Sequence, residues 1–543
     1  MLRELVIRGF VCPSAPKFVL HALYLSLALG CSIDAARRAD RAFVVAISHD
    51  PGHLNPAITT NGGVNTAAGL LYDGLLRLDE SLTPTPALAT RWETLDGGAR
   101  YRFHLRRDVR WHDGRPFTAA DVEFTFEQVL LKFHSRTRAS LGPALVDVVA
   151  LDDSTVEFRF RRPYAPLLQQ LDVVEAPIIP RHVYVGSDPL RNPANRHPVG
   201  TGPYKFVSYQ SSGEIRYAAN RDYFRGAPSV DTAILRVVPD PATQVAALEA
   251  GEVDWMFSVP GPERERLRHH PTVRLLQSPL GAGGNNCITT LGFNLDRATF
   301  RDLRVRKAIA HAVNRPQIVE RVLFGEGRAA DAPISSRIGF AYAADLPIPA
   351  FDTLRAAALL DAAGWRRSGS GTRTARGVRG VRDGTPFVVG LTVLPSQSNY
   401  AELLRAQLRA VGIDLRVGSL EQAVFAQTVF TERDFDTAIG AYCNGTDPEI
   451  GVRRMLVSSS IAPVPFSNMA GYRSASVDSL FELAASALDP AQRRLYYRSM
   501  QEIVVADQPY VWLAETLGTR AYNSRCSGFG ASSHFLATAS CTR

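Results

Sequence analysis

The chain has 543 residues, enough for roughly two to four domains with large hydrophobic cores. Hydrophobic residues make up 45% and charged residues 21%, which is ordinary for a globular protein and excludes disorder as the main state. The net charge of +8 comes almost entirely from arginine, and no recognisable nucleic-acid-binding module accompanies it. We therefore expect no nucleic-acid partner.

Residues 1–30 have the pattern of a signal peptide. Three basic residues precede an apolar run from Phe18 to Gly30, which is too short to span a bilayer comfortably. Ala28 and Gly30 are small, as a signal peptidase requires, and Cys31 follows directly. This placement resembles a lipoprotein processing site, although leucine is usual where Ala28 stands. Lipidation of Cys31, which would anchor the protein to the membrane, and ordinary cleavage both stay open. In either case we expect export to the periplasm, and no later segment is apolar enough to span a membrane.

Residues 100–133 predict a strand, a turn and a helix in succession. Tyr101–Leu105 alternates apolar and polar residues, the period of a half-buried strand, and Asp113-Gly114 supplies the turn. Thr118 can cap the helix while Asp121 complements its dipole. The helix then has one apolar face, formed by Val122, Phe126, Val129 and Phe133.

The rest of the chain alternates predicted strands and helices, which favours parallel sheets packed in lobes. Asp240 is expected to cap a helix that starts at Pro241 and stops at Gly251. The other predicted strands cover residues 234–238, 253–257, 387–394 and 413–417, and the other predicted helices cover residues 302–313, 316–324 and 400–411. Residues 366–384, rich in Gly and Arg, are predicted to form an exposed hairpin or loop.

Catalytic and metal-binding motifs are missing from the sequence. Histidines are scattered, no H-E-x-x-H or G-x-S-x-G motif occurs, and no two cysteines have the spacing of a metal site. We therefore expect neither an enzyme nor a bound metal or other cofactor. With Cys12 removed and Cys31 set aside, four cysteines remain in an oxidising compartment, and their spacing leaves three pairings open: Cys287, Cys443, Cys526 and Cys541.

Short motifs across nearly the whole chain stand in an order that resembles a known family. Besides the block at residues 100–133, these are Tyr72–Leu75 (YDGL), Val199–Tyr204 (VGTGPY), Leu248–Asp254 (LEAGEVD) and Phe293–Leu295 (FNL). Each motif alone is weak, but their order and spacing agree from about residue 43 to about residue 525. On these motifs the chain is identified as a member of bacterial extracellular solute-binding family 5, which serves peptide and nickel ABC importers.

The resemblance implies an α/β, periplasmic-binding-protein-like type II fold, with two lobes joined by a hinge and a third, inserted domain. Domain I would comprise residues 31–70, 200–282 and 505–543, domain II residues 71–199, and domain III residues 283–504. A ligand that contacts both lobes only when they are closed shifts the hinge equilibrium toward closure.

The implied function is the capture of a solute outside the inner membrane and its delivery to an ABC permease, by a protein that we expect to be a monomer. The expected cargo is a peptide or another small polar solute. A nickel chelate, haem, and a sugar or opine are alternatives within the family. A secreted hydrolase is the alternative from another class, and no motif supports it.

The resemblance also implies which residues line the cleft. Oligopeptide-binding members can have a cysteine at the position of Cys287, with its disulfide partner in a second cleft segment, which implies a bond between Cys287 and Cys443; buried free thiols are the alternative. Cys526 and Cys541 then remain as the second pair. The candidate ligand-binding residues are Asp50, Asn285, Asn286, Thr290, Tyr442, Asn444, Asp447 and Arg453.

Several of these candidates have a structural alternative. Asp447 can pair with the amino group of a peptide through a charge-assisted hydrogen bond, or it can cap the following helix. Tyr442 can stack on a ligand or pack against its own sheet. Arg453 and Arg454 can meet a carboxylate or lie in solvent. Asp50 can contact the ligand or belong to a turn.

Overall fold

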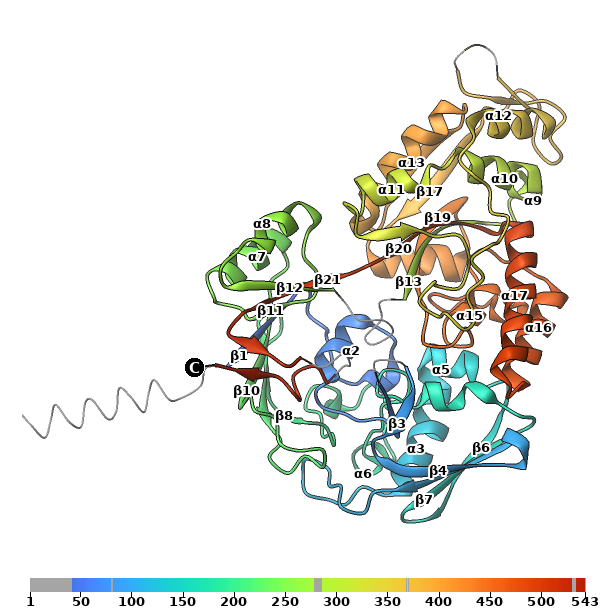
Figure 1. Ribbon diagram of the computed structural model, residues 1–543. Coiled ribbons are helices and arrows are strands. Elements are labelled where there is room, and N and C mark those ends of the chain that lie inside the picture. The colour runs from blue at the N-terminus through green and yellow to red at the C-terminus, as the bar shows by residue number, and fades with distance from the viewer. Residues whose placement is uncertain are drawn as a thin grey trace, which may run out of the picture.

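The computed structural model describes residues 42–79, 82–277, 286–367, 369, 371–529 and 534–542. The predicted signal peptide, Cys31 and Asn285 lie outside these residues. The three largest sheets have seven, six and four strands. In Figure 1 the seven-stranded sheet lies on the left, the four-stranded sheet at the lower right and the six-stranded sheet above them. No helix in the described ranges is both long and apolar enough to cross a bilayer. The mixed α/β class that we expected is confirmed.

We call residues 42–277 and 517–542 the lower lobe and residues 286–516 the upper lobe. The seven-stranded sheet of the lower lobe has the order β12 (Val273–Gln277), β21 (Thr519–Asn523), β11 (Trp255–Met256), β1 (Phe43–Ile47), β10 (Thr232–Val237), β9 (Glu214–Ala219) and β8 (Tyr204–Tyr209). Helices α7 (Pro241–Glu249) and α8 (Arg264–Arg268) pack against it. As predicted, Asp240 caps α7, and its carboxylate accepts a 2.8 Å hydrogen bond from the Thr243 amide.

The four-stranded sheet carries the strand–turn–helix block. Its order is β4 (Ala89–Leu95), β5 (Arg100–Leu105), β7 (Thr155–Phe160) and β6 (Leu145–Asp152), all antiparallel. Thr118 and Asp121 form the predicted capping box of α3 (Ala119–Phe124). The helix continues as a π-helical stretch over Thr125–Leu130 and ends as α4 (Leu131–Phe133). Its apolar face is buried at the first three predicted positions, Val122, Phe126 and Val129.

Two of the short sequence motifs meet around one carboxylate. Asp73 of the YDGL motif accepts hydrogen bonds of 2.9 Å from the hydroxyls of Thr201, in the VGTGPY motif, and Tyr223. In the same place the Gly202 amide donates to the Leu71 carbonyl, and a Cβ added at Gly200 would overlap that carbonyl. The VGTGPY motif is therefore a close approach of two backbones rather than only a tight turn.

The upper lobe is built on the six-stranded sheet. Its order is β14 (Gly327–Ala329), β20 (Tyr510–Thr516), β13 (Cys287–Phe293), β19 (Thr437–Cys443), β17 (Val388–Val393) and β18 (Asp414–Ser419). Helices α10 (Leu303–Ala312), α11 (Arg315–Arg321), α12 (Thr353–Ala362) and α13 (Ser398–Ala410) lie over one side, at the top of Figure 1, and contribute to one hydrophobic core with it. β20 belongs by its pairing to this sheet, although the predicted domain I included residues 505–543.

Most strand pairs are antiparallel, so the prediction of parallel sheets is wrong for them. Among the described strands, only β1 with β10 and β11, and β17 with β18 and β19, pair in parallel. Local hairpins such as β8–β9 account for some of the difference. Strands that enter a sheet from the far end of the chain, such as β20 and β21, account for more.

The segment 366–384 forms the predicted exposed hairpin, and most of its described residues are exposed. β15 (Trp365–Arg366) and β16 (Thr374–Ala375) pair in an antiparallel hairpin. Trp365 is buried and stacks on Phe387, with ring centroids 3.9 Å apart. Arg373 is buried too, because its guanidinium donates to the carboxylate of Asp361 and to a backbone carbonyl.

Helices on the opposite side of the upper lobe bring it against the lower lobe. They are α15 (Val452–Leu456), α16 (Ala475–Ser486) and α17 (Pro490–Asp507), at the right of Figure 1. α15 packs against α5 (Ser135–Ser140) of the lower lobe. Glu482 on α16 forms an ion pair with Arg162 of the lower lobe. The remaining short elements are α2 (Gly62–Ala68), α6 (Arg181–Tyr184), α9 (Ala298–Arg301), α14 (Gln422–Ala426), β2 (Leu76–Leu78) and β3 (Pro84–Pro86).

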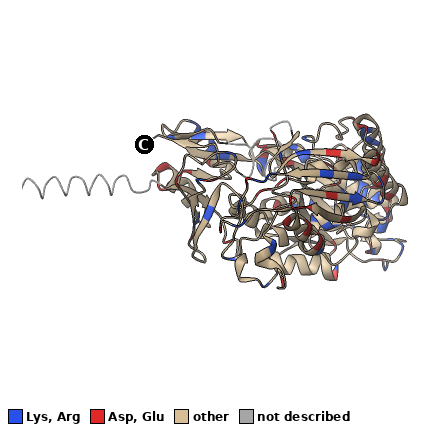
Figure 2. Ribbon diagram, turned by 90° about the horizontal axis from the view of Figure 1, so that it is seen from below, with Lys and Arg blue, Asp and Glu red and all other residues tan. Residues whose placement is uncertain are grey.

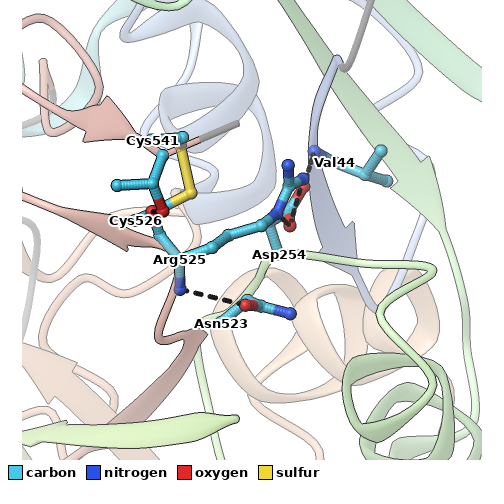
Figure 3. The surroundings of a disulfide bond; sticks show 7 residues. Val44, Asp254, Asn523, Arg525, Cys526 and Cys541 are labelled. Atoms are coloured by element: carbon cyan, nitrogen blue, oxygen red, sulfur yellow. Dashed lines mark hydrogen bonds and ion pairs between the residues drawn. A yellow bond between two sulfur atoms is a disulfide. The ribbon is translucent and has the colours of Figure 1, made fainter. Parts of the chain in front are cut away.

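The C-terminal tail is fastened to the seven-stranded sheet. β22 (Cys526–Ser527) and β23 (Ser540–Cys541) pair, and a disulfide joins Cys526 to Cys541, as expected (Figure 3). Arg525 forms an ion pair of 2.6 Å with Asp254, whose other carboxylate oxygen accepts from the Val44 amide. Asn523 also accepts a hydrogen bond from the Arg525 amide. The last residues are thereby tied to the first strand.

Charged residues of both signs are interspersed along the ribbon rather than gathered in one region (Figure 2). Many of the arginines lie next to a carboxylate, as the pairs of Arg304 with Asp302 and of Arg498 with Asp345 illustrate. In the part of the chain that the structure describes, the excess positive charge is therefore spread out rather than gathered in a basic stripe.

Candidate functional site

A cleft of about 900 Å³ lies between the two lobes. Its volume is within the range typical of small-molecule sites, roughly 300–1,000 Å³. The lower lobe contributes Ala46, Ile47, Ser48, His49, Thr60, Asn61, Gly62, Gly63, Thr66, Arg136, Pro241, Gln244, Phe257, Ser258 and Pro260. The upper lobe contributes Ser396, Asn399, Gln422, Ala441, Cys443, Arg454 and Phe466. A molecule bound here would touch both lobes.

The lower wall is formed where β1 ends and α2 begins. After Ile47 the chain leaves the sheet and places Ser48 and His49 at the cleft. Asn61 caps α2, because its side-chain oxygen accepts hydrogen bonds from the amides of Gly63 and Val64. This part of the wall is polar and shaped mainly by backbone and small side chains.

The upper wall is the exposed side of β19. Ala441 and Cys443 line the cleft, and the disulfide joins Cys443 to Cys287, its register partner on β13, as expected. Since side chains alternate along a strand, Tyr442 lies on the other side of the sheet. Tyr442 is buried there, and its hydroxyl donates to the Ser467 carbonyl over 2.9 Å. Of its two alternatives, the geometry favours packing against the sheet.

Phe466 reaches the cleft from a strained backbone position. Its φ of 61° lies in the left-handed region, which is rare for an aromatic residue. Its ring centroid is 5.6 Å from that of Phe430 and 6.0 Å from the guanidinium carbon of Arg454. Strain of this kind persists where the surrounding structure enforces it, and it is found often at ligand-binding sites.

Two arginines face the cleft, one from each lobe. Arg454 lies on α15 and Arg136 on α5, and their exposed fractions are only 7% and 8%. Among the described residues, the Nε and Nη1 atoms of Arg454 and the Nε atom of Arg136 have no hydrogen-bond partner. Arg136 pairs with Glu175 at 2.9 Å, whereas Arg454 forms no ion pair with a carboxylate in the described ranges, although the charge of Glu175 acts on it. Burial, and then the charge of Arg136, lower the pKa of Arg454 to about 10.

Three titratable groups lie behind the arginines, namely Asp172, Glu175 and His134. Burial raises the pKa of Asp172 to about 7, and burial also raises the pKa of Glu175. His134 is fully buried and hydrogen-bonds the Thr137 hydroxyl through Nδ1 at 2.7 Å. Burial, followed by the charges of Arg136 and Arg454, lowers its pKa well below the usual value, so it is neutral. Glu175 therefore pairs with Arg136, and the neutral ring of His134 adds no charge beside Arg454.

Asp447, the candidate partner of a peptide amino group, already has partners within the protein. Its carboxylate is fully buried and lies 2.7 Å from the guanidinium of Arg493 on α17. The same carboxylate accepts hydrogen bonds from the Tyr497 hydroxyl and from the Glu449 amide. The hydrogen bond from the Glu449 amide closes a turn that precedes α15. This role is close to the expected alternative in which Asp447 caps the following helix. Asp447 does not line the cleft.

Arg453, the other charged candidate, is also turned away from the cleft. It lies on α15 next to Arg454, but successive side chains on a helix point about 100° apart. Its guanidinium pairs with Glu449 at 3.3 Å and with Glu482. The face of α15 that reaches the cleft is therefore the one that carries Arg454, not Arg453.

The remaining candidates are held by backbone contacts. Thr290 donates to the Gly440 carbonyl, Asn286 to the Gly445 carbonyl and Asn444 to the Pro333 carbonyl. Asp50 accepts from the Tyr209 hydroxyl and from the amides of Gly52 and Ser212. Burial raises the pKa of Asp50, but these hydrogen bonds outweigh it, so the net pKa is lowered. None of the four side chains lines the cleft, and a ligand role for them stays a prediction.

The residues that do line the cleft had weak sequence signals. Arg454 was one of two neighbouring arginines, and only the phase of a short helix distinguishes it from Arg453. Arg136 and Phe466 stand in no motif, and the positive φ of Phe466 cannot be read from its residue type. No group of three or more His, Cys, Asp or Glu side chains in the described parts of the chain is placed to hold a metal ion.

Comparison with known proteins agrees with this two-lobed arrangement. The family model described as bacterial extracellular solute-binding proteins, family 5 Middle, matches residues 83–463. The oligopeptide-binding protein AppA of Bacillus subtilis is 29% identical over 485 residues, which cover 87% of this chain and 85% of that protein.

Solved structures show the same fold. AppA from Bacillus subtilis in complex with a nonapeptide has a TM-score of 0.79 at 25% identity, covering 92% of this chain and 99% of that one. NikA from Brucella suis in complex with Fe(III)-EDTA has a TM-score of 0.77 at 25% identity, covering 93% of this chain and 100% of that one. The expected periplasmic-binding-protein-like fold, with two lobes and an extra domain, is confirmed. Because the family model matches more than half of the chain, the protein belongs to family 5 of the bacterial extracellular solute-binding proteins.

Proposed function

We propose that this protein captures a peptide, or a similar small polar solute, and delivers it to an ABC permease in the inner membrane. The observation that carries the proposal is the interlobe cleft, which combines polar backbone, two arginines and two phenylalanine rings in about 900 Å³. AppA, whose solved structure holds a nonapeptide, supports a peptide cargo. NikA, whose structure holds Fe(III)-EDTA, keeps a metal chelate as the second candidate, because two arginines suit a polycarboxylate as well.

Closure of the two lobes around the cargo is part of this proposal. The chain crosses between lobes at residues 517–518, which link β20 of the upper sheet to β21 of the lower one. A link of so few residues can act as a hinge, because changes in its backbone dihedral angles change the angle between the lobes. The three-domain division given above is retained, except that residues up to Thr516 are assigned to the upper lobe.

A ligand screen tests the cargo. Purified protein lacking residues 1–31 would be heated with a library of di- to nonapeptides, opines, sugars and nickel chelates. A peptide that raises the melting temperature in proportion to the logarithm of its concentration supports the proposal, since a ligand stabilises only the state that binds it. A shift with a chelate or a sugar and with no peptide would overturn the peptide assignment.

Export and membrane attachment are the second part of the proposal. Residues 1–30 act as the signal peptide, and the mature protein lies in the periplasm, as a soluble monomer or attached through lipidated Cys31. Mass spectrometry of the mature N-terminus in wild type and in a Cys31→Ser variant separates the two cases. A lipid-modified Cys31 that is lost in the variant supports anchoring, and an unmodified N-terminus near this position supports ordinary cleavage.

A further inference from the structure

The two lobes contact each other along one rim of the cleft. α15 of the upper lobe packs against α5 of the lower lobe, and α16 packs against the 3₁₀ helix Ala165–Gln170 of the lower lobe. Arg454 on α15 and Arg136 on α5 both line the cleft, so these contacts border it. Figure 1 shows α5 and α15 to the right of the link between β20 and β21. The lobes cannot move apart at this rim without breaking the contacts.

Apolar side chains form one part of the rim. Ala485, at the end of α16, is buried in a hydrophobic core whose other buried members all belong to the lower lobe. Leu488, in the loop between α16 and α17, lies over Gly98 of the lower lobe, and a Cβ added at Gly98 would lie 2.8 Å from its Cδ2 atom. Opening the lobes would expose both side chains further, which costs free energy because apolar surface is returned to water.

Polar contacts cross the same rim. Glu482 on α16 pairs with Arg162 of the lower lobe and, within its own lobe, with Arg453. The Thr446 hydroxyl donates a hydrogen bond of 3.1 Å to the side-chain oxygen of Gln169. When the lobes open, Glu482 keeps Arg453, whereas Arg162 loses the one carboxylate that pairs with it among the described residues. The ion pair between the lobes therefore belongs to the closed state alone.

We propose that these contacts form a latch that holds the lobes closed before any cargo arrives. We call it the rim latch and define it by Glu482, Ala485 and Leu488 of the upper lobe and Gly98 and Arg162 of the lower lobe. Because its contacts exist only in the closed state, they shift the lobe equilibrium toward closure as a ligand does.

The rim latch regulates the cleft of the proposed function, on which this inference rests. A cleft that is already closed spares the cargo the free energy of closing the lobes, so the equilibrium affinity rises. Cargo enters during brief openings, which slows association, because binding then requires a conformational change. The latch thus trades speed of capture for strength of retention.

Small-angle X-ray scattering of protein without cargo tests the rim latch. Protein lacking residues 1–31 would be unfolded in guanidinium chloride, dialysed to remove bound cargo, and refolded with its disulfides intact. The test variant is Arg162→Met/Leu488→Ala. It removes one polar and one apolar contact of the latch and leaves Glu482 paired with Arg453. Melting curves check that each protein has refolded.

The matched control is Arg355→Met/Leu354→Ala, because both residues are exposed on α12, at the top of Figure 1. Wild type and the control are expected to give the scattering curve calculated from this closed structure. The test variant is expected to contain a larger share of open protein. Its ratio of open to closed molecules should rise roughly tenfold, the combined size of a partly exposed ion pair and a half-buried leucine.

Wild type that is open without cargo, or a test variant as compact as wild type, would overturn the rim latch. If the double variant fails to refold, Arg162→Met alone and wild type in about 1 M salt, which screens surface ion pairs, replace it. Both are expected to open in part, and unchanged curves for both would overturn the latch as well. No cargo is present in these measurements, so loss of the latch would leave the transport function intact, and failure of the ligand screen would leave the latch intact.

Discussion

Arg493 and Asp447 form a buried ion pair at 2.7 Å, so the acid expected to meet a ligand is bound to its own chain. Arg493 also donates to the Tyr497 hydroxyl and to the Ala484 carbonyl, which fixes its guanidinium between α16 and α17. Asp447 in turn holds the turn that leads into α15. The pair therefore positions the short helix α15, from which Arg454 reaches the cleft.

Arg493→Met tests the weight of this pair. The variant leaves the Asp447 carboxylate buried without its cation, which typically costs about 3–5 kcal/mol of the free energy of unfolding. Urea denaturation followed by tryptophan fluorescence measures the loss. Asp447→Asn in the Arg493→Met background is expected to recover much of it, since the unpaired charge is then gone. If Arg493→Met alone were as stable as wild type, this result would contradict the pairing of Arg493 with Asp447.

Gly200→Ala tests the contact between the two sequence motifs. The added methyl group would overlap the Leu71 carbonyl, and backbone on both sides prevents a small adjustment. We expect a loss of at least about 3 kcal/mol in the free energy of unfolding, at the upper end for overpacking. Gly418→Ala is the matched control, because its Cβ would meet no atom within 4 Å. Equal stability of the two variants would contradict the close approach.

The sequence predicted the family and much of the fold because the motif residues contact one another. Asp73 hydrogen-bonds both Thr201 and Tyr223, so motifs far apart in the chain constrain a single site. Capping residues were also predictable, since Asp240 and the pair of Thr118 and Asp121 act within one turn of the chain. Helix caps and contacts between motifs could therefore be predicted from the sequence.

The arginine that faces the cleft could not be predicted, because its direction depends on helix orientation, but Tyr442 could have been excluded. Cys443 was expected in the cleft, and strand alternation then excludes Tyr442 from it. Arg453 and Arg454 differ by one helical position, and only the packing of α15 against α5 decides which reaches the cleft. Sheet pairing was misjudged for a related reason, since β20 joins its sheet from far along the chain.

Acid should destabilise the protein through His112. Burial lowers the pKa of His112 to about 4, and its ring connects the Gly200 amide to the Gly202 carbonyl. In the unfolded chain histidine binds a proton near pH 6.5, so the unfolded state is favoured as the pH falls from 6.5 toward 4. The free energy of unfolding is expected to fall by about 1.4 kcal/mol per pH unit for one such histidine.

Melting temperatures of His112→Asn and wild type across this pH range measure that slope. The variant is expected to be less stable at pH 7.5 and to lose stability less steeply below pH 6.5. Buried His134 and His534 keep part of the slope, because burial lowers their pKa values as well. His269→Asn is the control, since that side chain is 75% exposed and lies beside Glu265 on the surface. Parallel curves for His112→Asn and wild type would contradict the assignment.

The disulfide between Cys526 and Cys541 should stabilise the C-terminal tail. The bond closes a loop with a sequence separation of 15, for which chain entropy predicts about 3 kcal/mol. The loop carries Phe535, whose ring lies 4.9 Å from that of Trp255, and His534, whose Nε2 lies 2.7 Å from the Tyr72 carbonyl oxygen. A Cys526→Ser/Cys541→Ser variant is therefore expected to unfold at lower urea concentration and to be trimmed at its C-terminus by carboxypeptidase.

Thiol titration provides the control for this experiment. Under denaturing, non-reducing conditions, protein lacking residues 1–31 should show no free thiol, because Cys287 is also bonded to Cys443. The double serine variant should show none either, which distinguishes loss of one bond from reshuffling of both. Four free thiols in the unreduced protein, or a variant with an unchanged unfolding midpoint and an intact tail, would contradict a stabilising role for the bond. Retained ligand binding in the trimmed variant is expected, since neither cysteine lines the cleft.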